Sequence, residues 1–246
     1  MSGRAEEAAD LLDRLWRENR TIDALPPELA PAGFEEALAI QAAFARRHAS
    51  CGWKVGPGPG GRGWTAAPLR GAALASPGRI AALPPPRLEV EVGLVLAADL
   101  PAGSTEAAAE AAIGGFHLAL ELFGSRYADP ARVDAAAIAA DNFNNAGVLL
   151  GGGVGAEAAP DLAGLGIRLF RDDVPVGQSD GGNGLAALLP ALCWLADYAA
   201  QRSKPLAAGD IVITGARIGP LPLDPGATYR AECRLGTAVL HVAAGS

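Results

Sequence analysis

Several features that assign a chain to a class are absent or nearly absent from this sequence. It has only three cysteines, Cys51, Cys193 and Cys233, which are odd in number and far apart. They do not have the spacing of zinc ligands, so we expect reduced thiols in a cytoplasmic protein. A catalytic cysteine is an alternative with little support in the sequence.

Long apolar runs and basic clusters are absent as well. No stretch is long and apolar enough to span a bilayer, and residues 1–20 lack the apolar core of a signal peptide. The formal net charge is −7, and no basic stripe is present. The glycine run at residues 151–155 lacks both the G-x-G-x-x-G spacing and the Walker lysine, so we expect a flexible turn there. We therefore expect neither a nucleic acid nor a membrane as partner.

The residues that are present predict a globular chain with its helices first. Half of the 246 residues are hydrophobic, which is enough for a substantial core. Glycine-rich and proline-rich segments at 57–63 and 84–86 predict irregular connections. Apolar periodicity predicts helices over residues 5–19, 34–49, 106–120 and 185–201, the last with an interruption near Pro190. Strands are expected at residues 52–56, 87–96, 146–150, 167–170, 174–176 and 211–214, with a closing antiparallel pair at 229–235 and 238–242. This order indicates the α+β class.

Glu89 and Glu91 stand two residues apart on an otherwise apolar predicted strand. Residues i and i+2 of a strand point to the same face, so the two carboxylates would lie side by side. Like charges repel, and a divalent cation with oxygen ligands would relieve the repulsion. An exposed strand face with two solvated glutamates is the simpler alternative for this tripeptide alone.

Other polar groups stand at the ends of predicted apolar elements. Glu121 follows the apolar helix expected up to Leu120, where a carboxylate is poorly placed for solvent. Three carboxylates are a reasonable ligand set for Mg²⁺ or Mn²⁺. The remaining groups of this kind are Lys54, Asp141, Asn142, Asp210 and Thr214.

The order of these motifs resembles the 2-keto-4-pentenoate hydratase / 2-oxohepta-3-ene-1,7-dioate hydratase / 4-oxalocrotonate decarboxylase family, part of the fumarylacetoacetate hydrolase superfamily. The resemblance extends over residues 34–242, nearly the whole chain. It is carried by G-W-K-V-G at 52–56, E-V-E at 89–91 with G-L-V-L at 93–96, L-E at 120–121 with S-R-Y at 125–127, A-D-N at 140–142 with G-V-L-L-G at 147–151, W-L-A at 194–196 and P-L-A-A-G-D-I-V-I-T-G-A at 205–216.

The resemblance implies a β-roll with helices packed outside it and an N-terminal helical segment. It also implies that Glu89, Glu91 and Glu121 hold Mg²⁺ or Mn²⁺ and that Lys54 is the active-site lysine. The substrate would be a small 2-oxo or 2-hydroxy-dienoic acid of aromatic catabolism, bound through its carboxylate and 2-oxygen. The metal would polarise the 2-oxo group and stabilise the enolate formed in hydration or decarboxylation.

Further expectations follow from the same resemblance. The residues that would contact substrate are Asp141, Asn142, Asn144, Asn145 and Thr214. Residues 1–75 would form the helical segment with the lysine strand, packed on a β-rich metal-binding catalytic domain of residues 76–246. Family members commonly form homo-oligomers, and association with a related decarboxylase or hydratase chain is a further expectation.

Two departures from the family pattern concern proton transfer. P-L-R-G at 68–71 matches a family segment, but residues 72–76 lack the carboxylate that usually follows it. D-N-F-N-N-A-G at 141–147 stands where the family usually has D-N-A-S-S-G, so amides replace serine hydroxyls. An amide orients substrate or water by hydrogen bonds but is not a general acid or base. Decarboxylation tolerates these changes better, since it needs mainly an electron sink.

Three functions are therefore compared. We favour a metal-dependent hydratase or decarboxylase. The alternative is a non-catalytic scaffolding or ligand-binding homologue, which the missing carboxylate after Gly71 favours. A carbon–carbon bond hydrolase ranks lowest, because such enzymes use a His-Glu pair and none of His48, His117 and His241 lies in the loop near Lys54.

Overall fold

A large curled sheet forms the centre of the protein. The structure, a computed structural model, describes residues 3–58, 61, 63–81 and 87–245. The strands of this sheet follow the spatial order β2-β1-β10-β5-β6-β7-β3, and β11 also pairs with β5. Their bounds are β1 Ser50–Pro57, β2 Trp64–Arg70, β3 Leu74–Ala75, β5 Arg87–Leu96, β6 Ile113–Phe123, β7 Asn145–Gly155, β10 Ile211–Ile213 and β11 Ile218–Pro222. β2 also contacts β7, because the sheet curls into a roll.

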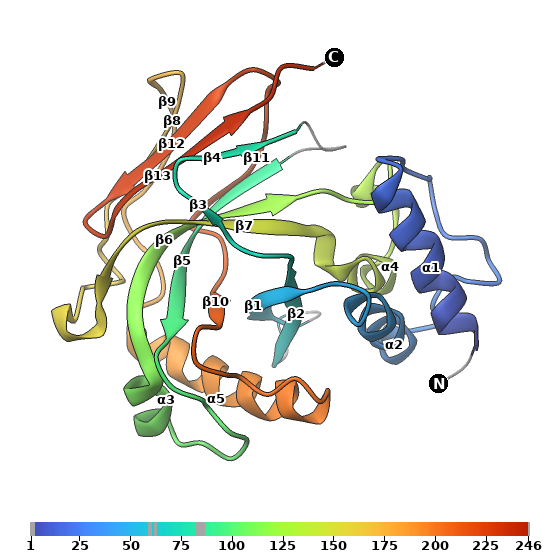
Figure 1. Cartoon of the computed structure of the whole chain (residues 1–246), viewed down its shortest axis with the longest axis horizontal. Helices are drawn as coiled ribbons and strands as arrows, with labels where there is room; N and C mark the ends of the chain where they lie inside the picture. The colour runs from blue at the N-terminus through green and yellow to red at the C-terminus, as the bar shows by residue number, and fades with distance from the viewer. Residues whose placement is uncertain (1–2, 59–60, 62, 82–86, 246) are drawn as a thin grey trace.

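A second sheet packs against the first (Figure 1). Its order is β4-β13-β12-β8-β9, with bounds Gly78–Ile80, Gly236–Val242, Thr228–Cys233, Ile167–Arg171 and Val174–Ser179. β13 lies on β6 and β7. The glycine run predicted to be a flexible turn is instead part of β7, and that prediction is wrong. At Gly152 an added Cβ would lie 2.9 Å from the Cα of Gly236, so the two strands approach closely only because a side chain is absent.

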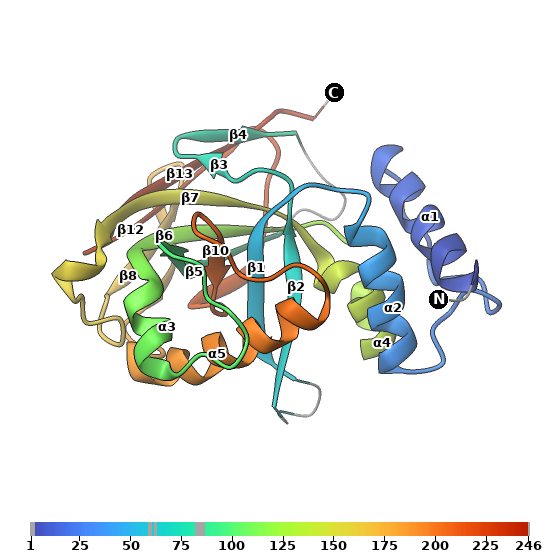
Figure 2. The ribbon, with the colours of Figure 1, turned by 60° about the horizontal axis from the view of Figure 1, so that its bottom comes forward.

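The α-helices form two groups on the outside. α3 (Glu106–Ala112) and α5 (Leu185–Gln201) pack together on one side of the roll. α1 (Gly3–Arg17), α2 (Phe34–Ala45) and α4 (Ala135–Ala140) gather at the other end, beside β1 and β2 (Figure 2). Short 3₁₀ turns cover Pro130–Arg132 and Ala156–Ala158, and a left-handed turn covers Asn142–Asn144. In the described part of the chain, none of the helices has the length and apolar character needed to cross a bilayer.

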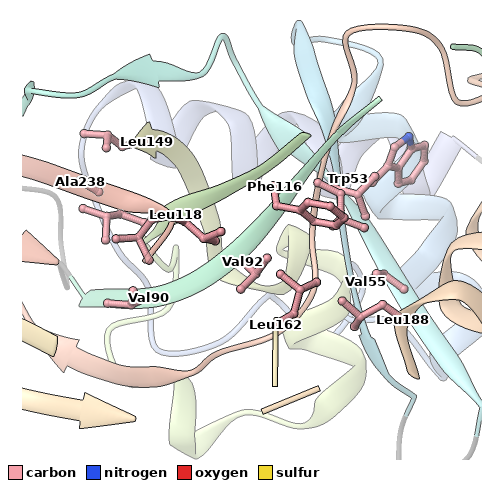
Figure 3. Close-up of a cluster of buried hydrophobic side chains, with 14 of the residues drawn as sticks. Trp53, Val55, Val90, Val92, Phe116, Leu118, Leu149, Leu162, Leu188 and Ala238 are labelled. Carbon is pink, nitrogen blue, oxygen red and sulfur yellow. The ribbon is translucent and has the colours of Figure 1, made fainter. Parts of the chain in front are cut away.

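Alternation along β5 divides the central sheet into an apolar face and a polar one. Leu88, Val90, Val92 and Leu94 are buried in the main core, together with side chains of β6 and α5. Figure 3 shows part of this core, including Val90, Val92 and Leu118. Glu89 and Glu91 therefore project from the opposite face.

One predicted helix is wrong over most of its length. The alanine-rich segment forms only the seven-residue α3, and the chain then continues as β6 instead of helix up to Leu120. Leu118, Leu120 and Leu122 enter the main core, whereas Ala119 and Glu121 face the other side, so the apolar period here is two and not 3.6. Pairing with β5 along its whole length outweighs the helix propensity of the neighbouring alanines. His117, expected on this helix, is a strand residue as well.

The other elements follow the prediction more closely. The α+β class and the long strand at 87–96 are confirmed, and the last two strands pair antiparallel as expected. α5 is continuous through Pro190, so the predicted interruption is wrong; buried leucines on both sides of the proline pack into the core. The predicted connection at 57–63 lies partly outside the described residues, and the one at 84–86 lies wholly outside them.

Candidate metal centre

The three predicted carboxylates meet on the polar face of the central sheet. Glu89 and Glu91 lie two residues apart on β5, and Glu121 stands directly opposite Glu89 in the antiparallel register of β6. One oxygen from each carboxylate can be chosen so that all three lie within 4.8 Å of one another. Glu91 and Glu121 are buried, with Glu121 fully inaccessible to solvent. The structure therefore contradicts the simpler alternative of solvated glutamates on an exposed face.

Lys54 reaches these carboxylates from a strand that is distant in the sheet order. Two strands, β10 and β5, separate its strand β1 from β6, which in a flat sheet would be a distance of about 14 Å. Its Nζ nevertheless lies 2.6 Å from Oε1 of Glu121. The curl of the sheet brings them together, so the lysine and the glutamates face one another across the inside of the roll.

The two oxygens of Glu121 have different surroundings. Oε1 accepts hydrogen bonds from Lys54 Nζ and from Nδ2 of Asn145, the latter at 2.9 Å. Oε2 is buried and has no hydrogen-bond partner among the described residues. A buried carboxylate oxygen without a partner carries a desolvation penalty, which a cation at that position would remove. The residues present thus fit a divalent cation with oxygen ligands.

The electrostatics of the cluster are those of crowded like charges with one counter-ion. Burial, followed by the charge of Glu121, raises the pKa of Glu89 to about 7 and that of Glu91 well above its ordinary value. Burial alone would lower the pKa of Lys54, but the charges of Glu121 and the other two glutamates outweigh it and raise that pKa. The lysine therefore stays protonated, and the cluster keeps excess negative charge above neutral pH.

The segment after β10 contributes a backbone donor. The N–H of Gly215 donates to Oε2 of Glu91 at 2.7 Å. Thr214, predicted to bind substrate, uses its hydroxyl to donate to the carbonyl of Val92 at 3.1 Å, which fixes this turn on β5. The Gly215 donor was not predicted, since no sequence pattern indicates where a backbone N–H will point.

Asn145 is a buried bridge between two strands. Its Nδ2 donates to Glu121, while its Oδ1 accepts from the backbone N–H of Arg70 on β2 at 3.0 Å. The residue is fully buried. Asn145 was predicted to contact substrate, and this stays a prediction; in the structure its side chain holds the Glu121 carboxylate in place.

The residues before Asn145 form an unusual turn. Asn142, Phe143 and Asn144 all have positive φ, between 49° and 59°. This conformation costs roughly 1–2 kcal/mol per residue for L-amino acids, so the surrounding contacts must impose it. Asn142 donates to the carbonyl of Pro68, whereas Oδ1 of Asn144 is buried and without a partner among the described residues.

Asp141 has structural partners. Its carboxylate forms a buried ion pair with Arg126 and accepts from the Ser125 hydroxyl at 3.1 Å. The backbone N–H of Arg126 donates to the same carboxylate at 2.9 Å. Among the described residues, Asp141 has no hydrogen bond or ion pair with Glu89, Glu91 or Glu121, so the structure does not join it to the carboxylate cluster. Arg126 was not predicted to be its partner.

Comparison with known proteins identifies relatives of this arrangement. Residues 69–243 match the protein family described as fumarylacetoacetate (FAA) hydrolase C-terminal. The chain is 33% identical over 152 residues to 2-keto-4-pentenoate hydratase of Paraburkholderia xenovorans (strain LB400), which is 61% of this chain and 55% of that protein. It is also 30% identical over 147 residues to 4-oxalocrotonate decarboxylase of Pseudomonas sp. This second match covers 60% of this chain and 56% of that protein. The matched segments thus span little more than half of these relatives.

The fold has solved counterparts. A structure of 4-oxalocrotonate decarboxylase from Pseudomonas putida G7, complexed with magnesium and adipate, superposes with a TM-score of 0.82. The alignment covers 98% of this chain and 97% of that one, at 21% sequence identity. This likeness confirms the roll architecture expected from the sequence.

Proposed function

Because this chain belongs to the fumarylacetoacetate hydrolase family, we propose that it is a metal-dependent lyase. Its substrates would be small 2-oxo or 2-hydroxy-dienoic acids, which it would hydrate or decarboxylate. The observation that carries the proposal is the group of Glu89, Glu91 and Glu121, in which the buried Oε2 of Glu121 has no partner among the described residues. The similar hydratase and decarboxylase sequences support the substrate class.

The three glutamates would hold Mg²⁺ or Mn²⁺, as hard cations prefer carboxylate oxygens. When bound, such an ion supplies Lewis-acid stabilisation of negative charge that develops on an oxo acid. The small apolar cluster beside Glu91, which includes Ala119, Ile211 and Ile213, lowers the local dielectric and strengthens this interaction.

Lys54 would provide the positive charge and the proton donor of the site. Its raised pKa keeps Nζ protonated, so it acts as an acid or a hydrogen-bond donor toward an anionic substrate oxygen. The chain has no carboxylate at residues 72–76, and the bridge Asn145 has no titratable proton. Because the metal would occupy the three glutamates, Lys54 and water are the groups to which we assign proton movement at this site. Assembly of several copies, or with a related chain, is also part of the proposal and rests on the family.

The test is turnover by metal-stripped and metal-loaded protein. Loss of dienoate absorbance is followed for a panel of 2-oxo- and 2-hydroxy-dienoic acids, with added Mg²⁺ or Mn²⁺ and with chelator. We expect turnover that requires the metal. In the Glu91→Gln variant we expect the metal affinity to fall by at least about tenfold, since one ligand charge is lost. Absence of turnover with saturating metal across the whole panel would contradict the proposal.

A second candidate function has one observation in its favour. The absence of a carboxylate at residues 72–76 is compatible with a non-catalytic scaffolding or ligand-binding homologue. Tight metal binding without turnover, together with co-purification of a related chain, would support it.

The hydrolase alternative has no support from the histidines. His48 contacts Asp13 and Arg70, His117 contacts the carbonyl of Gly151, and His241 contacts Thr228.

A further inference from the structure

The turn between β10 and β11, at residues 214–217, lies beside the carboxylate cluster. Its Gly215 N–H donates to Oε2 of Glu91 at 2.7 Å. Gly215 has a φ of 102°, which glycine adopts far more readily than other residues, so the direction of this N–H depends on the conformation of the turn. Whatever fixes the turn therefore also fixes a donor on one of the three glutamates.

The backbone attaches this turn to β5 only in part. The N–H of Arg217 donates to the carbonyl of Val90 at 2.8 Å, in addition to the bond that Thr214 forms with the same strand. β11 then pairs irregularly with β5, because the register shifts between Ile218 and Leu221. A regular ladder therefore does not hold the far end of the turn.

The side chain of Arg217 provides a second anchor, away from β5. Its Nη2 donates to the carbonyl of Asn183 at 2.5 Å. Asn183 lies in the loop between β9 and α5, two residues before α5 begins at Leu185. Several leucines of α5 are buried in the main core, so the acceptor is attached to a rigid element. This anchor joins the turn to the start of α5.

Gly182 leaves the space that the arginine fills. A Cβ built on Gly182 would lie 1.3 Å from Nη1 of Arg217 and 2.1 Å from its Cζ. The guanidinium therefore lies against the backbone of Gly182, and any larger residue would displace it. At the neighbouring Gly181, a Cβ would lie no closer than 4.0 Å to any atom of the described residues. Neither glycine has a φ in the left-handed region, so the arginine is what distinguishes the two positions.

The charge of Arg217 also acts on the cluster. Burial lowers the pKa of Arg217, and the charge of Glu91 opposes this change. A positive charge near the glutamates repels a bound cation, so a purely electrostatic role of Arg217 would weaken metal binding. A role in orienting Glu91 would strengthen it, and the two roles therefore predict opposite effects of removing the arginine.

We propose that Arg217, seated on Gly182, is a positioning residue of the metal centre, because it fixes the turn that directs the Gly215 N–H to Glu91. This hydrogen bond limits rotation of the carboxylate. Groups that orient a ligand in this way usually change metal affinity by about 10–100-fold. The inference rests on the proposed function, since it takes Glu91 to be a metal ligand.

The test compares the Mg²⁺ affinity of the full-length protein, measured by titration calorimetry, with its metal-free stability, measured by urea denaturation. In Gly182→Ala the arginine and its charge remain but the seat is filled, so we expect Mg²⁺ to bind about 10–100-fold more weakly. Gly181→Ala is the matched control and should bind Mg²⁺ as the original protein does. A merely structural role of the arginine would lower the stability without changing the Mg²⁺ affinity of the folded protein.

Arg217→Met separates the seat from the charge. We expect weaker Mg²⁺ binding, of about the same size as in Gly182→Ala, although a cation has been removed. Adding Gly182→Ala to Arg217→Met should weaken binding no further, because both changes act through the same contact. Arg234→Met removes an exposed arginine from the turn between β12 and β13 and should change neither the Mg²⁺ affinity nor the stability.

Three outcomes would overturn the inference: unchanged Mg²⁺ affinity in Gly182→Ala, tighter binding in Arg217→Met, or additive weakening in the double variant. Failure of the proposed function differs from these, because it is the absence of metal-dependent turnover with conjugated substrates. Mg²⁺ binding that depends on Arg217 and Gly182 in a protein without turnover would keep the positioning role and reject the lyase. An unaltered protein that binds no Mg²⁺ would contradict both.

Discussion

At the scale of single residues, Asn145 shows how an amide supports the carboxylate site without being a general acid or base. The amide bonds at one end to Glu121 and at the other to the backbone of Arg70. A serine hydroxyl, which the family resemblance leads us to expect in this segment, is too short to form both hydrogen bonds. The Asn145 amide therefore links β7 to both β6 and β2. It places no hydroxyl beside the glutamates.

We predict that Asn145→Ala weakens metal binding by about 10–100-fold, the usual effect of removing a group that orients a ligand. The free energy of unfolding should also fall by about 1–3 kcal/mol, because the buried N–H of Arg70 loses its acceptor. Asn145→Ser should recover part of the metal affinity. Calorimetry with Mg²⁺ and chemical denaturation measure the two effects.

Gln201→Ala, which removes an exposed amide at the end of α5, serves as the matched control and should change neither quantity. An unaltered metal affinity in Asn145→Ala would show that Glu121 keeps its position without the bridge.

The site residues differed in how far the sequence could predict them. Glu89 and Glu91 follow from the two-residue period of a strand, which is a local property. Glu121 was grouped with them although it was predicted at the end of a helix and lies on the strand β6. A carboxylate after an apolar run is unusual in a helix and in a strand alike. Asp141 and Asn145 were predicted to face substrate, yet their partners, Arg126 and Arg70, are set by tertiary packing that no local pattern contains.

At the scale of elements, the glycines of β7 explain how two sheets come into close contact. Gly151 and Gly152 face Ala238 and Gly236 of β13, at distances that leave no room for a Cβ. In the sequence the same residues look like a flexible turn. Glycine enrichment indicates both a turn and a close backbone approach, and only the packing partner distinguishes them.

We predict that Gly152→Ala destabilises the protein by about 1–3 kcal/mol through overpacking against β13. Gly56→Ala is the matched control. Gly56 lies in β1 without a positive φ, and a Cβ there would meet no atom within 4 Å, so the change should stay within about 0.5 kcal/mol. Urea denaturation of both variants measures the difference. Equal stability of the two would mean that the sheets separate at little cost.

Long alternating strands were the most predictable elements. The predicted bounds of β5 match the structure at both ends. The helix that begins at α3 was wrongly predicted to continue through β6, because the alanines favour a helix although the residues after them alternate as in a strand. β3 and β4, with two and three residues, are too short for any periodic signal. They form because β7 and β13 supply parallel partners for them.

At the scale of the whole molecule, the charge cluster links stability to pH and to metal. In the metal-free protein the pKa of Glu89 is raised to about 7, and that of Glu91 is raised as well. Between about pH 4.5, where an unfolded glutamate titrates, and pH 7, the folded state binds more protons than the unfolded state. These groups therefore make the folded protein less stable as the pH rises through that window.

We predict that Mg²⁺ raises the melting temperature more at pH 8 than at pH 5.5, because the ion binds only the deprotonated carboxylates. At a hundred times its dissociation constant the ion adds about 2.7 kcal/mol. Burial lowers the pKa of His48, which makes stability rise with pH in the same range. Comparing metal-loaded with chelator-treated protein at each pH cancels that contribution. An equal gain at both pH values would exclude the linkage.

The position of β10 in the sheet has a consequence for the order in which the protein is built. Trp53 of β1 pairs with Val212 of β10, and β10 in turn pairs with β5. The hairpin that carries Lys54 is thus joined to the glutamate strands by a segment that leaves the ribosome about 160 residues later, which is roughly 8–30 s at ordinary rates of synthesis. Until then the lysine hairpin lacks its parallel neighbour, and non-local pairing of this kind slows folding. From the synthesis of Glu121 to that of Ile211, 90 residues later, the acidic strands lack the segment that brings Lys54 beside them. We expect chaperones to act on the nascent chain in this shorter interval.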